Sequence, residues 1–236
     1  DRETRAQLLA LVNQLTGQPI PAEIAGYDAS LPGAHHFDLE RAREEMALAG
    51  HPVRREGDAW VADGIPEIEL WVGEGDTGRM YGELAQQDLA QIGITVTLRQ
   101  VAFPIFLEET GRRRTVSMLF QGWSADFPDA SNFLDVLFHS RSIHDEGSEN
   151  RTFYSNPELD VLLDRARIEP DASARTGMYR EASRIIVEDA PWAFIFSSVQ
   201  TEAWQPYVRG YRPHPVWSQL YRDICLTILV AEVDVR

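Results

Sequence analysis

Apolar residues recur at intervals of three and four in several stretches, which predicts helices with one buried face. Glycine follows three of these stretches, at positions 17, 50 and 93, where it commonly ends a helix. Asp38 and Asn156-Pro157 are typical first residues of helices. The expected helices span 2–15, 39–49, 77–92, a short one in 103–111, one that begins at Asn156-Pro157, and 173–188.

Four other stretches carry the pattern of strands. "ITVTLRQV" (94–101) alternates apolar and polar residues, which predicts a strand with one buried face. "EIELWV" (67–72), "TVSMLFQGW" (115–123) and "WAFIFSSV" (192–199) are apolar runs of the length expected for buried strands. Strands separated by helices along a single chain predict an α/β layer structure.

The composition limits the kinds of partner and chemistry that the chain can have. The 236 residues carry a net charge of −15 with a pI near 4.8, which argues against nucleic acid and anionic membrane surfaces. All 22 basic residues are arginine, so a lysine Schiff base is excluded within this chain. Cys225 is the single cysteine and cannot form an internal disulfide.

The sequence does not indicate in which cellular compartment the protein lies. No stretch reaches the roughly 18 apolar residues of a membrane helix. The chain begins with "DRETRAQLLALV", which has a helical pattern and no signal-peptide features. We therefore expect a fragment of a longer protein, whose location cannot be judged from the missing signal.

The stretch "GWSADFPDASNFL" (122–134) is unusual for a surface loop, because a Trp, a Phe and two carboxylates lie within a few residues of one another. A carboxylate that loses water among aromatic rings needs a cation. From the residues alone, Asp126 could be a solvated loop acid, an N-cap of the following helix, or a cation site. Asp129 could serve the loop or the helix start, and Trp123 could equally belong to the core.

Five segments in order resemble a known family. They are "FDLERAREEMALAGHP", "RMYGELAQQDLAQIGITVTLRQV", "GWSADFPDASNFL", "YSNPELDVLLDRAR" and "MYREASRIIVEDAPWAFIF". Together they resemble the C-terminal half of the family 5 extracellular solute-binding proteins, the oligopeptide- and dipeptide-binding receptors of ABC importers. The resemblance covers nearly the whole chain, and it rests on the order and spacing of the five segments.

The resemblance implies a lobe of the periplasmic-binding-protein type II fold, with a mixed sheet flanked by helices. Residues 1–205 would form the C-terminal ligand-binding lobe, including a lead-in segment 1–37, and residues 206–236 a tail that returns towards a missing N-terminal lobe. The implied function is non-enzymatic. A monomeric receptor, periplasmic or extracellular and in some forms lipid-anchored, would deliver peptides to a membrane permease without a cofactor or metal.

The resemblance also implies roles for particular residues. Asp126 lies where peptide-binding members place the carboxylate that accepts the α-ammonium of the ligand. Trp123, Ser124 and Phe127 complete the expected binding surface around it. Arg79 lies where dipeptide-binding members place an arginine for the C-terminal carboxylate, although it could equally be a surface arginine in the first turn of a helix.

Several alternatives stay open. Members of the family also bind nickel complexes, haem, opines or oligosaccharides, and a solute-binding lobe can be the sensing domain of a regulator. A metal site at His35, His36 and Asp38 is disfavoured, because adjacent histidines point apart and a third spaced ligand is not evident. The triad residue types at 139, 140, 144 and 145 lack a nucleophile-elbow motif, so a hydrolase is the least favoured reading.

Overall fold

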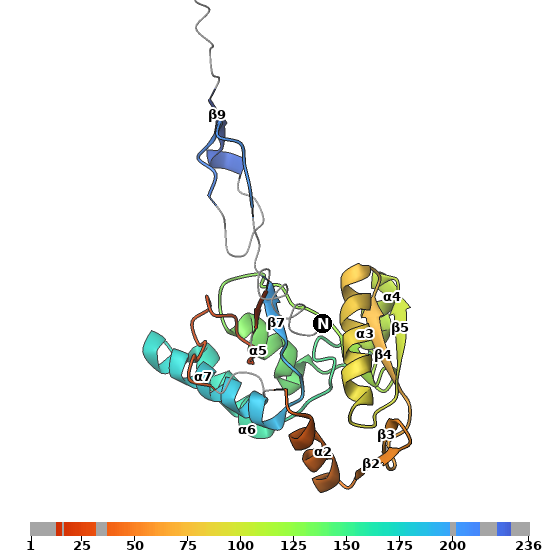
Figure 1. Ribbon diagram of the computed structural model, residues 1–236. Helices are drawn as coiled ribbons and strands as arrows, with labels where there is room; N and C mark the ends of the chain where they lie inside the picture. Colours follow the sequence, from red (N-terminus) through yellow and green to blue (C-terminus); the bar gives the residue numbers. More distant parts are fainter. Residues whose placement is uncertain (1–12, 16, 32–36, 199–201, 213–220, 228–236) are drawn as a thin grey trace, which may run out of the picture.

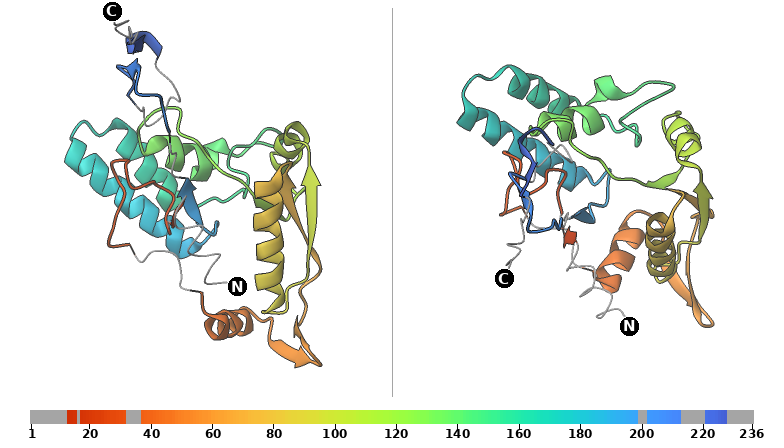
Figure 2. Two further views of the ribbon diagram at one scale, coloured as in Figure 1. Left: turned by 45° about the horizontal axis from the view of Figure 1, so that its top comes forward. Right: turned by 90° about the horizontal axis from the view of Figure 1, so that it is seen from above.

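The computed structural model describes residues 13–15, 17–31, 37–198, 202–212 and 221–227. Two bodies stand side by side in the views of Figures 1 and 2. One is a parallel sheet with its helices, and the other is a group of three helices. Each body has its own cluster of buried apolar residues. None of the helices in these ranges is long and apolar enough to cross a membrane.

The sheet body is built from two consecutive strand–helix–strand units. Strands β4 (Ile68–Gly73), β5 (Val96–Val101) and β6 (Met118–Phe120) are parallel, in the order β5-β4-β6. Helix α3 (Asp76–Ala90) connects β4 to β5, and α4 (Phe103–Thr110) connects β5 to β6. Parallel strands require such crossover connections. The core under α3 consists of Leu70, Val72 and Val96, with Ala85 and Leu89 packed on them.

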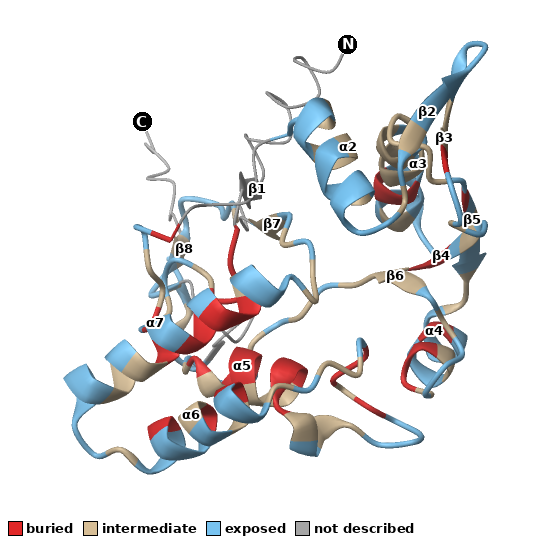
Figure 3. Ribbon diagram, turned by 90° about the horizontal axis from the view of Figure 1, so that it is seen from below, coloured by how far each residue is buried: buried red, intermediate tan, exposed pale blue. Residues whose placement is uncertain are grey.

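The helical body consists of α5 (Ser131–Phe138), α6 (Pro157–Ile168) and α7 (Ala172–Asp189), with a 3₁₀ turn at Ser140–Ser142 after α5. Helix α6 starts as its sequence predicts. The Asn156 side chain accepts the N–H groups of residues 158 and 159, and Pro157 follows it. Figure 3 shows buried stretches in all three helices and exposed ones on the outer sides of α6 and α7. The fully buried side chains include Leu134, Leu159, Leu163 and Ile186.

The segment 17–31 belongs to the helical body rather than to a free linker. The Gln18 amide donates to the carbonyl of Asp28 at 2.8 Å and accepts its N–H at 3.1 Å, which closes the segment into a loop. Ile20 is fully buried in the helical core. Gly26 has φ +109° and lies so close to Tyr179 that a β-carbon would be 3.0 Å from that of the tyrosine. Glycine is therefore required both for the backbone angle and for the space.

The segment after α7 joins the two bodies through alternating aromatic residues. Trp192 and Phe194 pack against Phe138 of α5, with ring centroids 5.2 and 6.1 Å away. Phe196, in strand β7 (Phe196–Ser198), stacks on Tyr81 of α3 at 5.0 Å. The Tyr81 ring also stacks on Phe120 of β6, at 5.1 Å. One extended segment thus contacts both cores.

The structure corrects the sequence-based assignment at the start of the chain. Asn13–Leu15 was expected to end a helix, but it forms strand β1, antiparallel to β7. Pairing with a distant strand outweighs the local helical preference of these residues. The rest of that expected helix, residues 1–12, lies outside the described residues.

A hairpin was also missed. Strands β2 (Val53–Glu56) and β3 (Ala59–Ala62) pair antiparallel around the two-residue loop Gly57-Asp58, in which Gly57 has φ +61°. Before the hairpin lies α2 (Leu39–Leu48), with Asp38 as its N-cap, as predicted. The Arg43 guanidinium lies 3.8 Å from the centre of the Trp60 ring, which attaches α2 to the hairpin.

The other predicted helices and the strands at 67–72 and 94–101 are confirmed within a few residues, and so is the α/β fold class. The strands expected at 115–123 and 192–199 are shorter, at three residues each, and neither is fully buried. The parallel strands and the antiparallel pairs lie in separate sheets. Near the end of the chain, β8 (Val208–Arg209) pairs with β9 (Cys225–Leu226), and η2 (Tyr221–Asp223) precedes β9. Figure 1 shows this pair away from both bodies.

Replacing Leu163 by alanine tests the helical core. The side chain is fully buried between α6 and its neighbours, so the truncation leaves a cavity and should lower the free energy of unfolding by about 2–5 kcal/mol. Val161→Ala on the same helix is the control, because Val161 is 61% exposed and should change stability by about 0.5 kcal/mol or less. Urea unfolding measures both. Equal effects of the two variants would contradict the assignment of the core.

Candidate functional site

The loop between β6 and α5 carries four of the five residues singled out from the sequence. It follows the carboxyl end of a parallel strand, the usual position of ligand sites in α/β sheets. Ser124, Asp126 and Phe127 are exposed, and Phe127 keeps 46% of its surface accessible. Trp123 is half-buried and packs against the helical core. The loop thus presents a carboxylate and a phenyl ring, backed by a fixed indole.

A buried amide holds the loop in place. Asn132, the second residue of α5, is 2% exposed. Its Oδ1 accepts the indole N–H of Trp123 at 3.1 Å and the backbone N–H of Asp126 at 3.0 Å. Its Nδ2 lies 3.5 Å from Asp126 Oδ2, which is a long and weak hydrogen bond. Asn132 was not among the residues predicted from the sequence, although a polar residue in the first turn of a strongly apolar helix was visible there.

The second acid of the loop has a structural task. Asp129 Oδ1 accepts both the N–H and the hydroxyl of Ser131, the first residue of α5, at 3.0 and 2.8 Å, and so forms the turn that leads into the helix. Its other oxygen lies 3.5 Å from a guanidinium nitrogen of Arg175 on α7. Of the two uses considered for Asp129, the helix start is the one observed. Asp126 has no ion-pair partner among the described residues.

The N-terminus of α5 is already satisfied by the loop itself. The N–H of Asn132 donates to the Asp129 carbonyl, and those of Phe133 and Leu134 donate to the Ala130 carbonyl. The N–H of Ser131 is taken by the Asp129 side chain, as above. The first N–H groups of a helix attract anions when they are unpaired. Since these are paired, the local chemistry suits a cation beside Asp126 better than an anion.

Arg79 lies in the first turn of α3 and is about half exposed. Its guanidinium pairs within its own helix, with Asp76 at 3.2 Å and Glu83 at 3.9 Å. Within the described ranges it makes no recorded contact with the loop that carries Asp126. The structure therefore does not bring Arg79 and the loop residues into one contact network.

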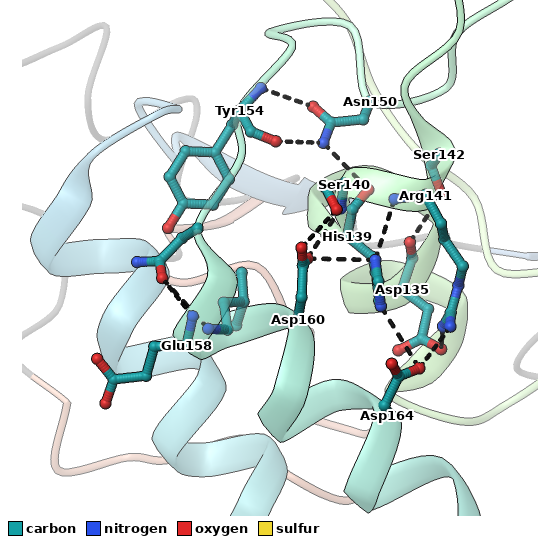
Figure 4. Close-up of polar contacts among 12 residues, drawn as sticks. Asp135, His139, Ser140, Arg141, Ser142, Asn150, Tyr154, Glu158, Asp160 and Asp164 are labelled. Atoms are coloured by element: carbon teal, nitrogen blue, oxygen red, sulfur yellow. Dashed lines mark hydrogen bonds and ion pairs between the residues drawn. The ribbon is translucent and has the colours of Figure 1, made fainter.

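A second polar cluster, drawn in Figure 4, contains the triad residue types noted in the sequence. The Ser140 hydroxyl donates to Asp160 of α6, not to the neighbouring His139. His139 is 5% exposed, and its Nδ1 accepts the backbone N–H of Arg141 at 3.1 Å. A nucleophilic serine needs a hydrogen bond to its base, so this arrangement is not a hydrolytic triad.

The charges of this cluster hold the turn after α5 against α6. Burial raises the pKa of Asp135, although Arg141 donates to it at 2.6 Å and partly offsets the effect. The same guanidinium donates to Asp164 at 2.6 Å and lowers the pKa of that carboxyl. Arg141 thus links α5 and α6, and the cluster has a structural role.

Metal ligands were considered at two histidines. His35 and His36 lie outside the described residues, while Asp38 caps α2. In the parts of the chain that the structure covers, His, Cys, Asp and Glu do not gather in a group of three or more that could hold a metal ion.

The chain is similar to known solute-binding proteins. It is 31% identical over 202 residues to di/tripeptide-binding protein 2 of Pseudomonas aeruginosa, a match that covers 84% of this chain and 35% of the relative. It is 28% identical over 197 residues to haem-binding protein A of Haemophilus influenzae, covering 84% of this chain and 34% of the relative. The chain thus spans about a third of the length of these relatives.

A solved structure and a family model agree with these relatives. The ABC transporter-associated periplasmic binding protein DppA of Helicobacter pylori, solved in complex with the peptide STSA, superimposes with a TM-score of 0.74 at 25% identity. That match covers 95% of this chain and 41% of the other. The sequence model of the bacterial extracellular solute-binding proteins, family 5 (middle part), matches residues 5–145. The chain belongs to the family 5 bacterial extracellular solute-binding proteins.

Proposed function

We propose that this chain forms most of one lobe of a peptide receptor, which binds peptides in a cleft between two lobes and delivers them to an ABC importer. Asp126 carries the proposal. It is an exposed carboxylate on a loop fixed from below, next to aromatic side chains, and lacks a partner cation among the described residues. The relatives that are named for di- and tripeptides, and the peptide complex of the similar structure, support the ligand class.

The free amino terminus of a peptide fits the chemistry of this loop. It is a compact cation with three N–H donors, and it loses its water when a cleft closes over it. A carboxylate in a fixed position then replaces that water through charge-assisted hydrogen bonds. Phe127 and Ser124 lie beside Asp126 on the same exposed loop, and Trp123 forms its base. These side chains would exclude water from the ion pair without selecting one ligand sequence.

The role of the whole protein extends beyond these residues. We take residues 1–205 as the ligand-binding lobe and 206–236 as a tail that leads towards a second lobe. The pairing of β8 with β9, apart from both bodies in Figure 1, supports this division. The receptor would act as a monomer without a cofactor or catalysis, in the periplasm or outside the cell, as a soluble or lipid-anchored protein. Its partner would be the membrane permease of the importer.

Haem is a second candidate ligand, because one similar relative is named for it. The negative charge of Asp126 favours a peptide over haem as the ligand. Haem carries anionic propionates, which Asp126 would repel, whereas a peptide presents a cation to it. Opine, nickel-complex and oligosaccharide ligands remain as outcomes of the first experiment below.

Blocking the amino terminus of the ligand tests Asp126 directly. We expect the natural-length protein to bind tripeptides with free amino termini and to bind their N-acetylated forms much more weakly. Asp126→Asn should lose about 2–5 kcal/mol of binding free energy for the free peptides, because one partner of a desolvated pair is removed. Isothermal titration calorimetry measures both.

Asp58→Asn is the matched control, since Asp58 is fully exposed in the β2–β3 turn and should bind like wild type. Equal affinity for free and acetylated peptides would make Asp126 an ordinary loop acid. Binding of neither form, with binding of haem, an opine, a nickel complex or an oligosaccharide instead, would overturn the peptide assignment.

Arg79 is proposed as a partner of the ligand's carboxylate, and amidated peptides test it. Arg79→Gln should lower the binding free energy of dipeptides with a free carboxylate by about 1.5–3 kcal/mol. The binding of their C-terminal amides should not change. Arg41→Gln is the control, because Arg41 also lies in the first turn of a helix and pairs with acids of its own helix. Equal changes in binding free energy for free and amidated dipeptides would mean that Arg79 does not bind the ligand's carboxylate.

A further inference from the structure

We propose that Asn132 is the positioning residue of the ligand site: its buried amide fixes the backbone at Asp126 and the indole of Trp123, so that the carboxylate faces the ligand before binding. The inference deepens the proposed function and rests on it, since it concerns the same ammonium site. It is carried by three contacts that converge on one buried side chain.

The amide can be oriented in only one way. The indole N–H of Trp123 and the backbone N–H of Asp126 are both donors without any acceptor capacity. Both lie within 3.1 Å of the same atom of Asn132, which must therefore be its oxygen. The carbonyl oxygen has two lone pairs, and these two donors use both. The NH₂ group is then left to face the Asp126 carboxylate, at 3.5 Å from Oδ2.

This orientation gives the amide two separate effects on the site. Through its oxygen it fixes the position of the Asp126 backbone, and therefore the point from which the Asp126 side chain extends. Through its NH₂ group it places a donor on one side of that carboxylate, which leaves the other oxygen, Oδ1, for a ligand. Both effects come from a side chain that a ligand does not touch, because Asn132 is 2% exposed beneath the loop.

The surroundings of Asn132 make it a rigid support. It lies in the first turn of α5, whose next two residues, Phe133 and Leu134, are buried in the core. Its own N–H donates to the Asp129 carbonyl at 3.1 Å, so the loop is attached to it at a third point. A side chain locked by packing holds a binding group more accurately than a free loop does. A leucine at this position would leave both N–H donors without this acceptor.

The experiment measures selectivity for the ammonium group, which a loss of stability alone does not change. Wild type, Asn132→Ala, Asp126→Asn and the double variant are titrated with one tripeptide and with its des-amino analogue, which lacks the ammonium. All four are assayed in the natural-length protein at a temperature where each is folded. We expect Asn132→Ala to reduce the preference for the free amine by about tenfold, the equivalent of one or two lost hydrogen bonds. In the Asp126→Asn background the same change should have no further effect on the preference.

A matched control separates positioning from folding. Asn150 is fully buried, and its amide holds the backbone of Tyr154, at 2.8 Å, without any recorded contact to the loop of Asp126. Asn150→Ala should lower the melting temperature as Asn132→Ala does but keep the wild-type preference for the free amine. If Asn150→Ala reduces the preference as much as Asn132→Ala, the effect is one of general stability and the proposal is wrong.

The two proposals fail in different ways. If the wild-type protein itself does not prefer the free amine over the des-amino analogue, the proposed function fails at Asp126. If wild type shows the preference and Asp126→Asn removes it, but Asn132→Ala keeps it, the peptide receptor stands and the role of Asn132 is refuted. An additive effect of the two substitutions would also refute it, because a positioning residue acts only through the group it positions.

Discussion

The exposed loop that carries the candidate site depends on one buried hydrogen-bond acceptor. The oxygen of Asn132 receives the N–H groups of Trp123 and Asp126, and the helix behind it is buried in the core of the molecule. A loop with an exposed carboxylate gains little from its own apolar contacts. Its order comes from these bonds, from the packing of Trp123 on the helical core and from the turn that Asp129 forms with Ser131. The cost of leaving a buried polar group unpaired keeps this arrangement in place.

The position of the loop also depends on the packing of the rest of the fold. The loop leaves the sheet body at β6 and enters the helical body at α5, so its position depends on how the two bodies meet. They meet at the aromatic segment after α7, where Phe194 contacts α5 and Phe196 contacts Tyr81 of α3. Aromatic contacts of this kind are large and directional. The loop of the candidate site, between two packed bodies, is thereby given a defined place without a long secondary-structure element of its own.

Much of the fold could be predicted from local patterns. The caps at Asp38 and Asn156 and the alternation along 94–101 identify elements that the structure contains. The failures have a common cause. Asn13–Leu15 is a strand because β7 lies beside it, and this partner is more than 180 positions away in the sequence. The hairpin at 53–62 carried a usable signal, a Gly-Asp pair between two short runs, that was not recognised.

The candidate site, too, could be predicted only as far as its contacts are local in sequence. The family resemblance identified the loop and its exposed acid, because both are properties of a short continuous segment. The segment already offered the helix start as a use of Asp129, because its partner Ser131 lies two residues away, but the ion pair of Asp129 with Arg175 of α7 could not be read from it. Asn132 was missed for a similar reason: its importance lies in the convergence of two donors on one oxygen, and only the folded chain brings them together.

A crystal structure of the natural-length protein with a bound tripeptide would test the central claim most directly. The account predicts that the ammonium nitrogen of the peptide lies about 2.7–2.9 Å from a carboxylate oxygen of Asp126, the distance of a charge-assisted hydrogen bond. The Asn132 oxygen should keep both of its N–H partners in that complex. A peptide whose ammonium is bound by another acid, with Asp126 facing solvent, would contradict the account.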